Sequence, residues 1–305
     1  MNADAIKQRC GFVAVIGAPN AGKSTLVNAL VGGKVSIVSP KVQTTRTMVR
    51  GIVVKDQSQV IFIDTPGIFQ PEKRLERAMV SVAWQGEHDA DIVMLIVDAA
   101  HKKSLRQSED IIRKLAGGDH KRPCVLVLNK VDKVKKEELF ALAQRLNDML
   151  PFTATFMVSA LKENRTSDIL DWLAWHGPGG GWDYQEDQLR DMPSPPLAAE
   201  ITREKLFHRL HQELPYALTV ETEGWENFDN GSIKIDQVVY VARETHKGIV
   251  LGKGGAQIKH IGETARQELE TILECRVHLK IFVKVSERWQ DDPERYALWG
   301  LDSSS

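Results

Sequence analysis

The sequence predicts an α/β protein of two domains, a larger one on a mixed, mostly parallel six-stranded sheet and a smaller α+β one. Up to residue 175, apolar strand runs alternate with helical patterns, and the pattern changes after a break rich in glycine and proline. A length of 305 residues also exceeds one average domain. We therefore expect a first domain at 1–176, a linker at 177–195 and a second domain at 196–305.

Six apolar runs are the candidate strands of the first domain. They are 12–16, 49–55, 60–64, 92–98, 125–129 and 156–159. Only four residues separate the second run from the third, which predicts a hairpin and one antiparallel strand. Helix-length segments such as 104–115 and 136–150 separate other runs and predict parallel crossovers. A ligand then belongs at the carboxyl ends of the parallel strands.

The second domain begins after two runs that cannot continue a helix, 177–181 and 193–196. Its expected order is α-β-β-α-α-β. The elements with clear limits are an amphipathic helix, two strands, a long helix and a last strand, at 197–214, 217–221, 233–241, 256–274 and 277–285. Asp229-Asn230-Gly231 between the first two strands is a strong turn signal.

Composition and charge indicate an ordinary globular protein with an uneven charge distribution. The chain is 42% hydrophobic and 27% charged, with a net charge of −1. Residues 1–180 carry 25 basic and 19 acidic residues, whereas the remainder carries 15 and 22. A polyanion bound by the second half must therefore meet a local basic patch.

The cysteines and the apolar runs indicate a soluble intracellular protein. Three distant cysteines form no C-x-x-C pair, which fits a reducing cytosol and predicts neither a metal site nor a disulfide framework. No apolar run approaches the length of about 20 residues that a spanning helix needs. The amino terminus lacks a signal-peptide core. We also expect a monomer.

A complete phosphate-loop motif follows the first strand run. Gly17-Ala18-Pro19-Asn20-Ala21-Gly22-Lys23-Ser24 matches G-x-x-x-x-G-K-[ST]. Its glycines let backbone N–H groups point at a polyphosphate, Lys23 reaches the β- and γ-phosphates, and the Ser24 hydroxyl faces Mg²⁺. A helix starting near Thr25 adds the positive end of its dipole. The alternative is a glycine-rich turn before an ordinary helix.

Three later segments, each at a strand end, indicate which nucleotide binds. In Asp64-Thr65-Pro66-Gly67, Asp64 can hold Mg²⁺ through water and the Gly67 N–H can meet the γ-phosphate. In Asn129-Lys130-Val131-Asp132, the Asp132 carboxylate can accept from two guanine donors that adenine lacks, and Lys130 lies along the base. Ser159-Ala160-Leu161 can supply a backbone N–H to the guanine oxygen. The set predicts a GTP and GDP site, with a solvated helix cap as the alternative for Asp132.

With these motifs the chain resembles the translation-factor-like GTPases and, within them, the Era family. The resemblance rests on 17–25, Gln43-Thr44-Thr45-Arg46, 64–67, 129–132 and 159–161. It implies that a threonine completes the Mg²⁺ shell beside Ser24 and Asp64. We assign this role to Thr45, next to the arginine; Thr44 and a solvent-exposed threonine stay open as alternatives.

The residue after the D-x-x-G motif predicts slow intrinsic hydrolysis. Ras-type GTPases orient the attacking water with a glutamine there, but this chain has Ile68, and an apolar residue is what the family carries. We therefore expect Lys23, Gly67 and Asn20 to carry catalysis. In related potassium-dependent GTPases an asparagine at this loop position helps to hold K⁺; the alternative is a turn-shaping Asn20. Arg46 of the same chain could also contribute to hydrolysis, although nothing in the sequence indicates that its side chain reaches the phosphates.

A second glycine-rich turn indicates RNA binding. Val250-Leu251-Gly252-Lys253-Gly254-Gly255-Ala256-Gln257-Ile258 resembles the I-G-x-x-G-x-x-I core of a KH domain, and the element order is that of a type II KH fold. Residues 243–260 have a local net charge of +3. The expected RNA contacts are Arg243, Lys247, Gly252, Lys253, Gly254, Gly255 and Lys259. The alternative is a helical hairpin with solvated basic residues.

A GTPase domain followed by a KH domain is the Era arrangement. The resemblance extends to Arg203-Glu204-Lys205, Glu213-Leu214-Pro215-Tyr216 and Val283-Lys284-Val285. It implies binding near the 3′ end of small-subunit ribosomal RNA, maturation of the 30S subunit, and peripheral association with the inner face of the membrane. The alternatives are a GTPase of tRNA modification, a small-molecule P-loop kinase, and a membrane or protein-interaction switch without RNA.

Overall fold

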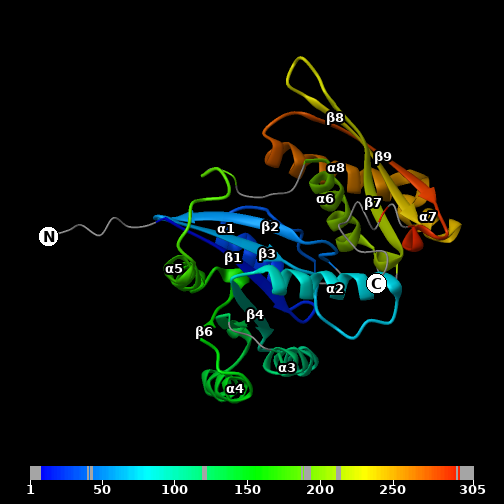
Figure 1. Cartoon of the computed structure of the whole chain (residues 1–305). Helices are drawn as coiled ribbons and strands as arrows, with labels where there is room; N and C mark the ends of the chain where they lie inside the picture. Colours follow the sequence, from blue (N-terminus) through cyan, green and yellow to red (C-terminus); the bar gives the residue numbers. More distant parts are fainter. Residues whose placement is uncertain are drawn as a thin grey trace. The chain divides into compact units, whose positions relative to one another are not determined.

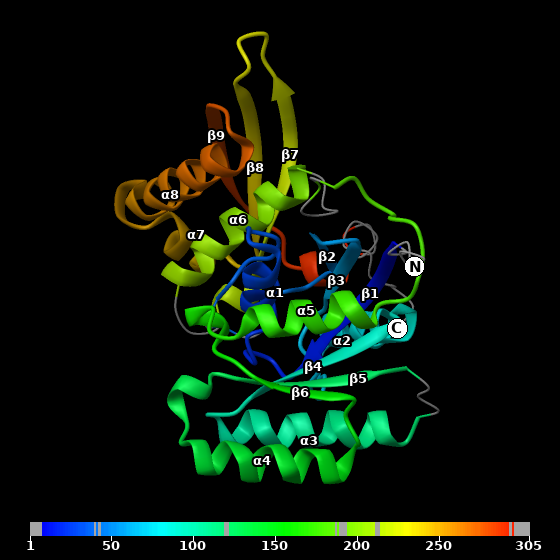
Figure 2. The same cartoon turned by 90° about the vertical axis from the view of Figure 1, so that its left-hand side faces the viewer.

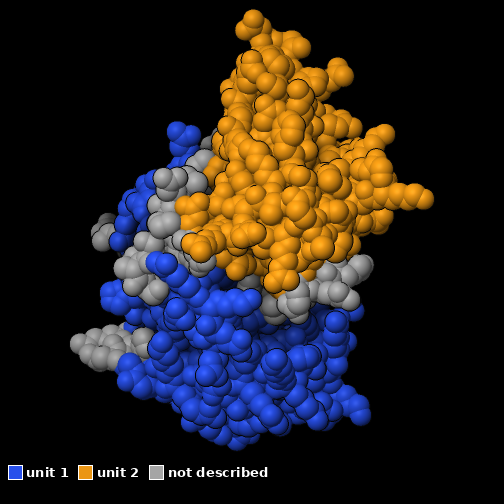
Figure 3. Space-filling model, turned by 90° about the vertical axis from the view of Figure 1, so that its right-hand side faces the viewer, with its two compact units in different colours: residues 1–36, 45–191, 297–305 blue, residues 37–44, 192–296 orange. Residues whose placement is uncertain are grey.

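The computed structural model describes residues 8–39, 41, 44–118, 122–186, 188, 194–210, 214–292 and 295. Gln43 and Glu213, which contribute to the motifs above, and the distal part of the expected linker lie outside the described residues. The chain divides into two compact units (Figure 3). The first unit comprises 1–36, 45–191 and 297–305, and the second comprises 37–44 and 192–296.

The first unit contains the expected mixed sheet. Its strands are β1 (Arg9–Gly17), β2 (Val49–Lys55), β3 (Ser58–Asp64), β4 (Ile92–Asp98), β5 (Cys124–Asn129) and β6 (Ala154–Met157). Their order is β2-β3-β1-β4-β5-β6. The β2–β3 pair is antiparallel and the other pairs are parallel, as the short gap between the second and third runs predicts.

Helices cover both faces of this sheet (Figures 1 and 2). They are α1 (Lys23–Val31), α2 (Arg74–Asp89), α3 (Lys102–Ala116), α4 (Lys136–Met149) and α5 (Thr166–His176). The helices α1 and α5 pack together on the β2–β3 side, and α2, α3 and α4 contribute to one core with β1, β4 and β5. The strands β3, β4 and β5 are buried along their whole length, because parallel crossovers place a helix on each face.

The second unit places three helices against a three-stranded sheet. Its elements are α6 (Ser194–Arg209), β7 (Leu218–Asn227), β8 (Ile233–Val241), α7 (Glu244–Leu251), α8 (Ala256–Leu273) and β9 (Val277–Val285). The sheet order is β7-β8-β9, with β7 antiparallel and β9 parallel to β8. This α-β-β-α-α-β order is the predicted one. The β7–β8 hairpin extends past the helices of its unit (Figure 2), and Gly231 in its turn has a φ of 79°.

Short 3₁₀ turns complete the two units. They are η1 (Val131–Lys133), η2 (Ala160–Lys162), η3 (Leu214–Ala217), η4 (Lys253–Gly255) and η5 (Trp289–Asp291). The first helix of the second unit ends at Arg209, five residues before the predicted limit, and a separate 3₁₀ turn begins at Leu214. No helix among the described residues is long and apolar enough to cross a membrane.

The proximal part of the expected linker packs on the first unit. Gly179 forms an antiparallel bridge with Arg9, and the Cys10 N–H donates to the Pro178 carbonyl at 3.2 Å. The backbone N–H groups of Asp183 and Tyr184 donate to the Gln59 amide oxygen at 3.0 Å each. These residues therefore pack at the start of β1 and β3, two inner strands of the sheet.

Candidate functional site

Two glycines of the phosphate loop stand where a side chain would clash with its surroundings. A Cβ on Gly17 would lie 2.3 Å from the Ile96 carbonyl oxygen, and one on Gly22 would lie 2.3 Å from the Asn129 amide nitrogen. Gly22 has a φ of 96° and Asn20 a φ of 61°, conformations that glycine and asparagine tolerate best. The loop 17–22 therefore connects β1 to the amino terminus of α1 by a tight turn, as its glycine spacing predicts.

Lys23 is buried beneath this turn. Its side chain is folded back so that Nζ donates to the carbonyl oxygens of Gly17 and Ala18, both at 3.2 Å. Burial lowers the pKa of Lys23 to about 8, although the Asp64 carboxylate opposes that shift. A bound phosphate would favour the charged form further, so this lysine is suited to hold an anion.

Three oxygen-bearing side chains meet beside Lys23. The Ser24 hydroxyl lies 2.7 Å from Asp64 Oδ2 and 2.9 Å from Thr45 Oγ1, and Thr45 Oγ1 lies 3.4 Å from the same Asp64 oxygen. Asp64 is fully buried, which raises its pKa, and its other oxygen, Oδ1, has no hydrogen-bond partner. Hydroxyl and carboxylate oxygens are the ligands that Mg²⁺ prefers, so these residues fit that cation. Thr45, rather than Thr44, belongs to this group.

Thr44 points elsewhere, because its hydroxyl donates to the Lys41 carbonyl at 2.7 Å. It ends segment 37–44, which packs within the second unit on α6. The Glu204 carboxylate accepts from the Val38 N–H at 2.7 Å, and Arg203 donates to the Thr44 carbonyl. Segment 37–44 is therefore held by α6 up to the residue that precedes Thr45.

The loop after β3 approaches the phosphate loop closely. A Cβ on Gly67 would lie 2.9 Å from Pro19 Cα, and the Ile68 N–H donates to the Gly17 carbonyl at 3.0 Å. The Ile68 side chain is 6% exposed and belongs to the hydrophobic core. It therefore points away from the loop surface and cannot orient a water molecule. The neighbouring Thr65 and Pro66 are also buried.

Asn129 connects the base-recognition segments to the phosphate loop. Its amide nitrogen donates to the Ala21 carbonyl at 2.9 Å, and its oxygen accepts from the N–H groups of Lys130 and Ala160 at 2.8 and 3.0 Å. Because the side chain is only 2% exposed, these bonds fix the three segments relative to one another. Its role is to position the loops.

Asp132 and Lys130 form the exposed edge of the same site. Asp132 accepts from the Ser159 hydroxyl at 2.8 Å, which lowers the pKa of the carboxyl group and keeps it ionised. Lys130 has a φ of 64°, and its Nζ donates to the Asn20 carbonyl at 2.7 Å and to Asp98 at 2.6 Å. In the 159–161 turn Ser159 and Ala160 are buried and the Ala160 N–H donates to Asn129, whereas the Leu161 side chain is 81% exposed.

Asp98 is the site residue that the motif analysis missed. It ends β4, is 5% exposed and forms the ion pair that fixes the Lys130 ammonium. The available signal was its place, because a carboxylate ending a strand run at the ligand edge resembles Asp64 in position. We regard Asp98 as a positioning residue for Lys130.

The second glycine-rich turn lies between α7 and α8. Gly252, Gly254 and Gly255 have φ values of 71°, 60° and 77°, and a Cβ on Gly254 or Gly255 would meet nothing within 4 Å. This backbone is therefore open to a ligand on one side. The side chains of Lys253 in the turn, Lys259 on α8 and Arg243 at the start of α7 are exposed, and that of Lys247 on α7 is half-buried. Ile249 is 54% exposed on the preceding helix, an apolar surface suited to a base.

Comparison with known proteins matches both halves of the chain. Residues 12–130 match the 50S ribosome-binding GTPase family, and residues 213–290 match the KH domain family. GTPase Era of Sinorhizobium medicae is 56% identical over 300 residues, which cover 98% of this chain and 96% of that protein. The chain belongs to the Era family. GTPase Era of Mesorhizobium japonicum is 57% identical over 96% of this chain and 93% of its own length.

Solved Era structures share the fold over nearly the whole chain. Era in complex with MgGDPNP and nucleotides 1506–1542 of 16S ribosomal RNA has a TM-score of 0.89, with 36% identity over 96% of this chain and 99% of that one. A variant of Aquifex aeolicus Era bound to GDP and AlF₄⁻ has a TM-score of 0.87 at the same identity and coverage. The fold class predicted from sequence is confirmed, and the chain is a GTPase that hydrolyses GTP to GDP and phosphate.

Proposed function

We propose that this GTPase binds the 3′ end of small-subunit ribosomal RNA and assists maturation of the 30S subunit. The main observation behind the proposal is the turn at Gly252–Gly255, where Gly254 and Gly255 have positive φ and open backbone and Lys253 and Lys259 are exposed. A GxxG turn of this kind clamps the backbone of single-stranded RNA. The related Era that was solved with nucleotides 1506–1542 of 16S RNA supports the choice of RNA.

The nucleotide site supports a Mg²⁺-dependent hydrolysis in which positioning supplies most of the rate. Ser24, Thr45 and Asp64 would hold the cation, which would neutralise charge on the phosphates when bound. Lys23 holds the β- and γ-phosphates, and the Gly67 N–H positions the γ-phosphate. Since Ile68 is buried in the core, no side chain at that place orients the water, and slow intrinsic turnover follows.

Potassium is the second part of the proposal. Asn20 is an exposed residue of the phosphate loop. Its backbone has a left-handed conformation, and its carbonyl accepts a hydrogen bond from Lys130 Nζ. An amide oxygen at this place can help to hold K⁺ beside the β- and γ-phosphates. The cation would stabilise charge that an arginine finger stabilises in other GTPases.

We further propose that the nucleotide state controls the affinity for RNA through segment 37–44. Thr45 belongs to the cation-binding group, whereas the preceding residues are fixed to α6 by Glu204, Arg203 and Lys41. Because Thr44 and Thr45 share one peptide bond, withdrawal of Thr45 after hydrolysis would pull directly on a segment that packs in the RNA-binding unit.

The cellular location is a proposal from the family resemblance. We propose a cytoplasmic monomer that associates peripherally with the inner face of the membrane. Fractionation of cell extracts tests this, because a protein found entirely in the soluble fraction at low salt would contradict the membrane association.

Crosslinking in cells tests the function. The full chain is crosslinked to RNA in living cells and the bound fragments are sequenced, with Gly254→Asp as the matched variant. We expect fragments from the 3′ end of small-subunit RNA, depleted in the variant because a carboxylate would face the RNA backbone. Absence of such fragments, or equal recovery from both proteins, would overturn the RNA proposal and leave the GTPase activity intact.

A further inference from the structure

The stretch of chain after α1 is fixed beside the end of β3. The Asn28 amide oxygen accepts from the backbone N–H groups of Val35 and Ser36, both at 2.9 Å, and its amide nitrogen donates to the Ser36 carbonyl at 2.8 Å. Val35 packs over Gly51 of β2, where an added Cβ would lie 3.2 Å from Val35 Cγ1. In the sheet, Asp64 pairs with the residue two positions before Gly51. These contacts hold Ser36 close to the end of β3, where Asp64 lies.

The Ser36 hydroxyl acts on Asp64 without completing a hydrogen bond. Burial raises the pKa of the Asp64 carboxyl group, and the Ser36 hydroxyl is one of the neighbouring groups that oppose this shift. Ser36 Oγ and Asp64 Oδ1 nevertheless have no hydrogen-bond partner among the described residues. Ser36 is 4% exposed and Asp64 is fully buried, so bulk water does not satisfy these atoms. Since buried polar atoms are almost always paired, we expect the two to pair when the site is occupied.

The two oxygens of the Asp64 carboxyl group have different surroundings. Oδ2 accepts from the Ser24 hydroxyl at 2.7 Å and lies 3.4 Å from Thr45 Oγ1, so it belongs to the group that fits Mg²⁺. Oδ1 is not part of that group. A carboxyl group that serves a cation site is in turn held by hydrogen bonds, which fix its orientation and strengthen metal binding. Ser36 supplies the neighbouring hydroxyl that can donate to Oδ1.

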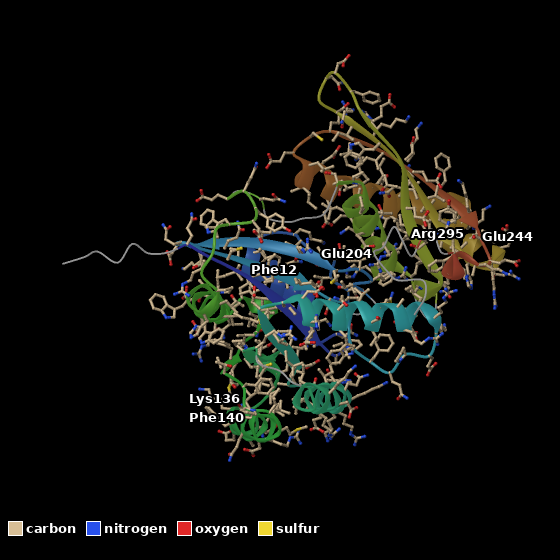
Figure 4. All side chains as sticks on the ribbon, in the orientation of Figure 1. Phe12, Lys136, Phe140, Glu204, Glu244 and Arg295 are labelled. Carbon is tan, nitrogen blue, oxygen red and sulfur yellow. The ribbon has the colours of Figure 1, made fainter. Side chains whose placement is uncertain are left out.

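The chain is also fixed on the carboxyl-terminal side of Ser36. The carboxylate of Glu204, which is labelled in Figure 4, accepts from the Val38 N–H at 2.7 Å. Ser36 is the last residue of the first unit before segment 37–44, and Thr45 is the first residue after that segment. Segment 37–44 is therefore flanked on each side by a hydroxyl group that acts on the Asp64 carboxyl group.

We propose that Ser36 is a positioning residue of the cation site, whose hydroxyl donates to Asp64 Oδ1 and fixes the carboxyl group for Mg²⁺ binding. This inference rests on the proposed Mg²⁺-dependent hydrolysis and adds a residue that lies outside the nucleotide-binding motifs. Ser36 acts through Asp64 and contacts neither the nucleotide nor the cation. Because Asn28 and Glu204 fix the backbone on both sides, the hydroxyl is in place before the cation binds.

The test measures cation affinity instead of turnover. The full chain is saturated with a non-hydrolysable GTP analogue, Mn²⁺ is added stepwise, and free Mn²⁺ is measured by electron paramagnetic resonance. Ser36→Ala should raise the Kd for Mn²⁺ about 10-fold, because removal of a group that orients a metal ligand weakens metal binding about 10- to 100-fold. In the Asp64→Asn background the same substitution should change the Kd less than about 2-fold, since the hydroxyl acts through that carboxyl group.

Ser104→Ala is the matched control. Ser104 of α3 is 5% exposed, and its hydroxyl likewise has no hydrogen-bond partner in the part of the chain that the structure describes. The control removes the same group from a buried place in the same unit and should change the Kd for Mn²⁺ less than about 2-fold. Thermal unfolding of the free proteins checks the fold. Because an unpaired buried hydroxyl costs free energy, neither variant should unfold below the wild-type temperature.

Three outcomes would overturn the inference. A Kd of Ser36→Ala for Mn²⁺ within about 2-fold of the wild type would leave Ser36 without a role at the cation site. Equal losses in Ser36→Ala and Ser104→Ala, or a lower unfolding temperature of Ser36→Ala, would assign the hydroxyl to the fold alone. An undiminished effect in the Asp64→Asn background would show that the hydroxyl does not act through Asp64. If the wild type binds no Mn²⁺, the proposed Mg²⁺-dependent hydrolysis itself fails, which is a distinct result.

Discussion

The substitution Asp132→Asn tests guanine recognition most selectively. The carboxylate accepts from the Ser159 hydroxyl at 2.8 Å and lies 3.5 Å from the Lys162 ammonium, on the exposed side of the base site. Two acceptor oxygens match the two donors of guanine. Asparagine keeps one of these acceptors and places an N–H group opposite the second guanine donor.

The expected loss of GDP affinity follows from the number of hydrogen bonds that the substitution removes. One charge-assisted hydrogen bond disappears, and each such bond contributes about 10- to 150-fold to binding. The guanine donor that faces the new N–H group loses its partner as well. We therefore expect the Kd for GDP to rise about 100- to 1,000-fold. The phosphate loop, which Asp132 does not touch, should remain intact.

The assay is calorimetric titration with GDP and with xanthosine diphosphate, whose 2-oxo group accepts the asparagine N–H. The variant should prefer the xanthine nucleotide, whereas the wild type should prefer GDP. Asp98→Asn is the control, because it loosens Lys130 without removing a base contact and should cost less than about 10-fold. GDP affinity of Asp132→Asn within about 3-fold of the wild type would refute the assignment of this carboxylate to guanine.

Three further predictions test other parts of the account. Burial lowers the pKa of Lys23 to about 8, and a bound phosphate should raise it, so GDP binding at pH 8 should take up about half a proton, measured by calorimetry in two buffers. The affinity for GDP should then fall as the pH rises, and the absence of proton uptake would contradict the lowered pKa of Lys23. GTP hydrolysis should be faster in KCl than in NaCl, and Asn20→Ala should abolish the difference; equal wild-type rates would exclude the K⁺ role. Gly67→Ala should lower the affinity for a GTP analogue more than that for GDP, because its Cβ would lie 2.9 Å from Pro19 Cα, and equal losses would place Gly67 outside the γ-phosphate site.

The strand pattern and the nucleotide motifs were readable from sequence because both are local. Runs of buried residues predict β2, β4, β8 and β9 to the residue, since a strand covered by helices needs a continuous or alternating apolar run. The limits of β1 were missed: it begins at Arg9, where its partners are Ser58 and Gly179. Partners so distant in the sequence leave no local signal.

The features missed entirely depend on tertiary contacts. Segment 37–44 reads as a loop continuous with the phosphate-binding domain, yet Ile37 packs with Leu197 and Ile201 of the second unit. The assignment of Thr45, by contrast, was made from its place next to the arginine, and its hydroxyl lies beside Ser24 and Asp64 in the structure.

The central claim is that the bound guanine nucleotide controls the affinity of this chain for RNA. The most direct measurement is the Kd of the full chain for an RNA with the sequence of nucleotides 1506–1542 of 16S ribosomal RNA in the presence of a non-hydrolysable GTP analogue and of GDP, at fixed salt and Mg²⁺. The account predicts tighter binding with the GTP analogue, and loss of that difference in Thr45→Ala. Equal affinity of the wild type in both nucleotide states would contradict it.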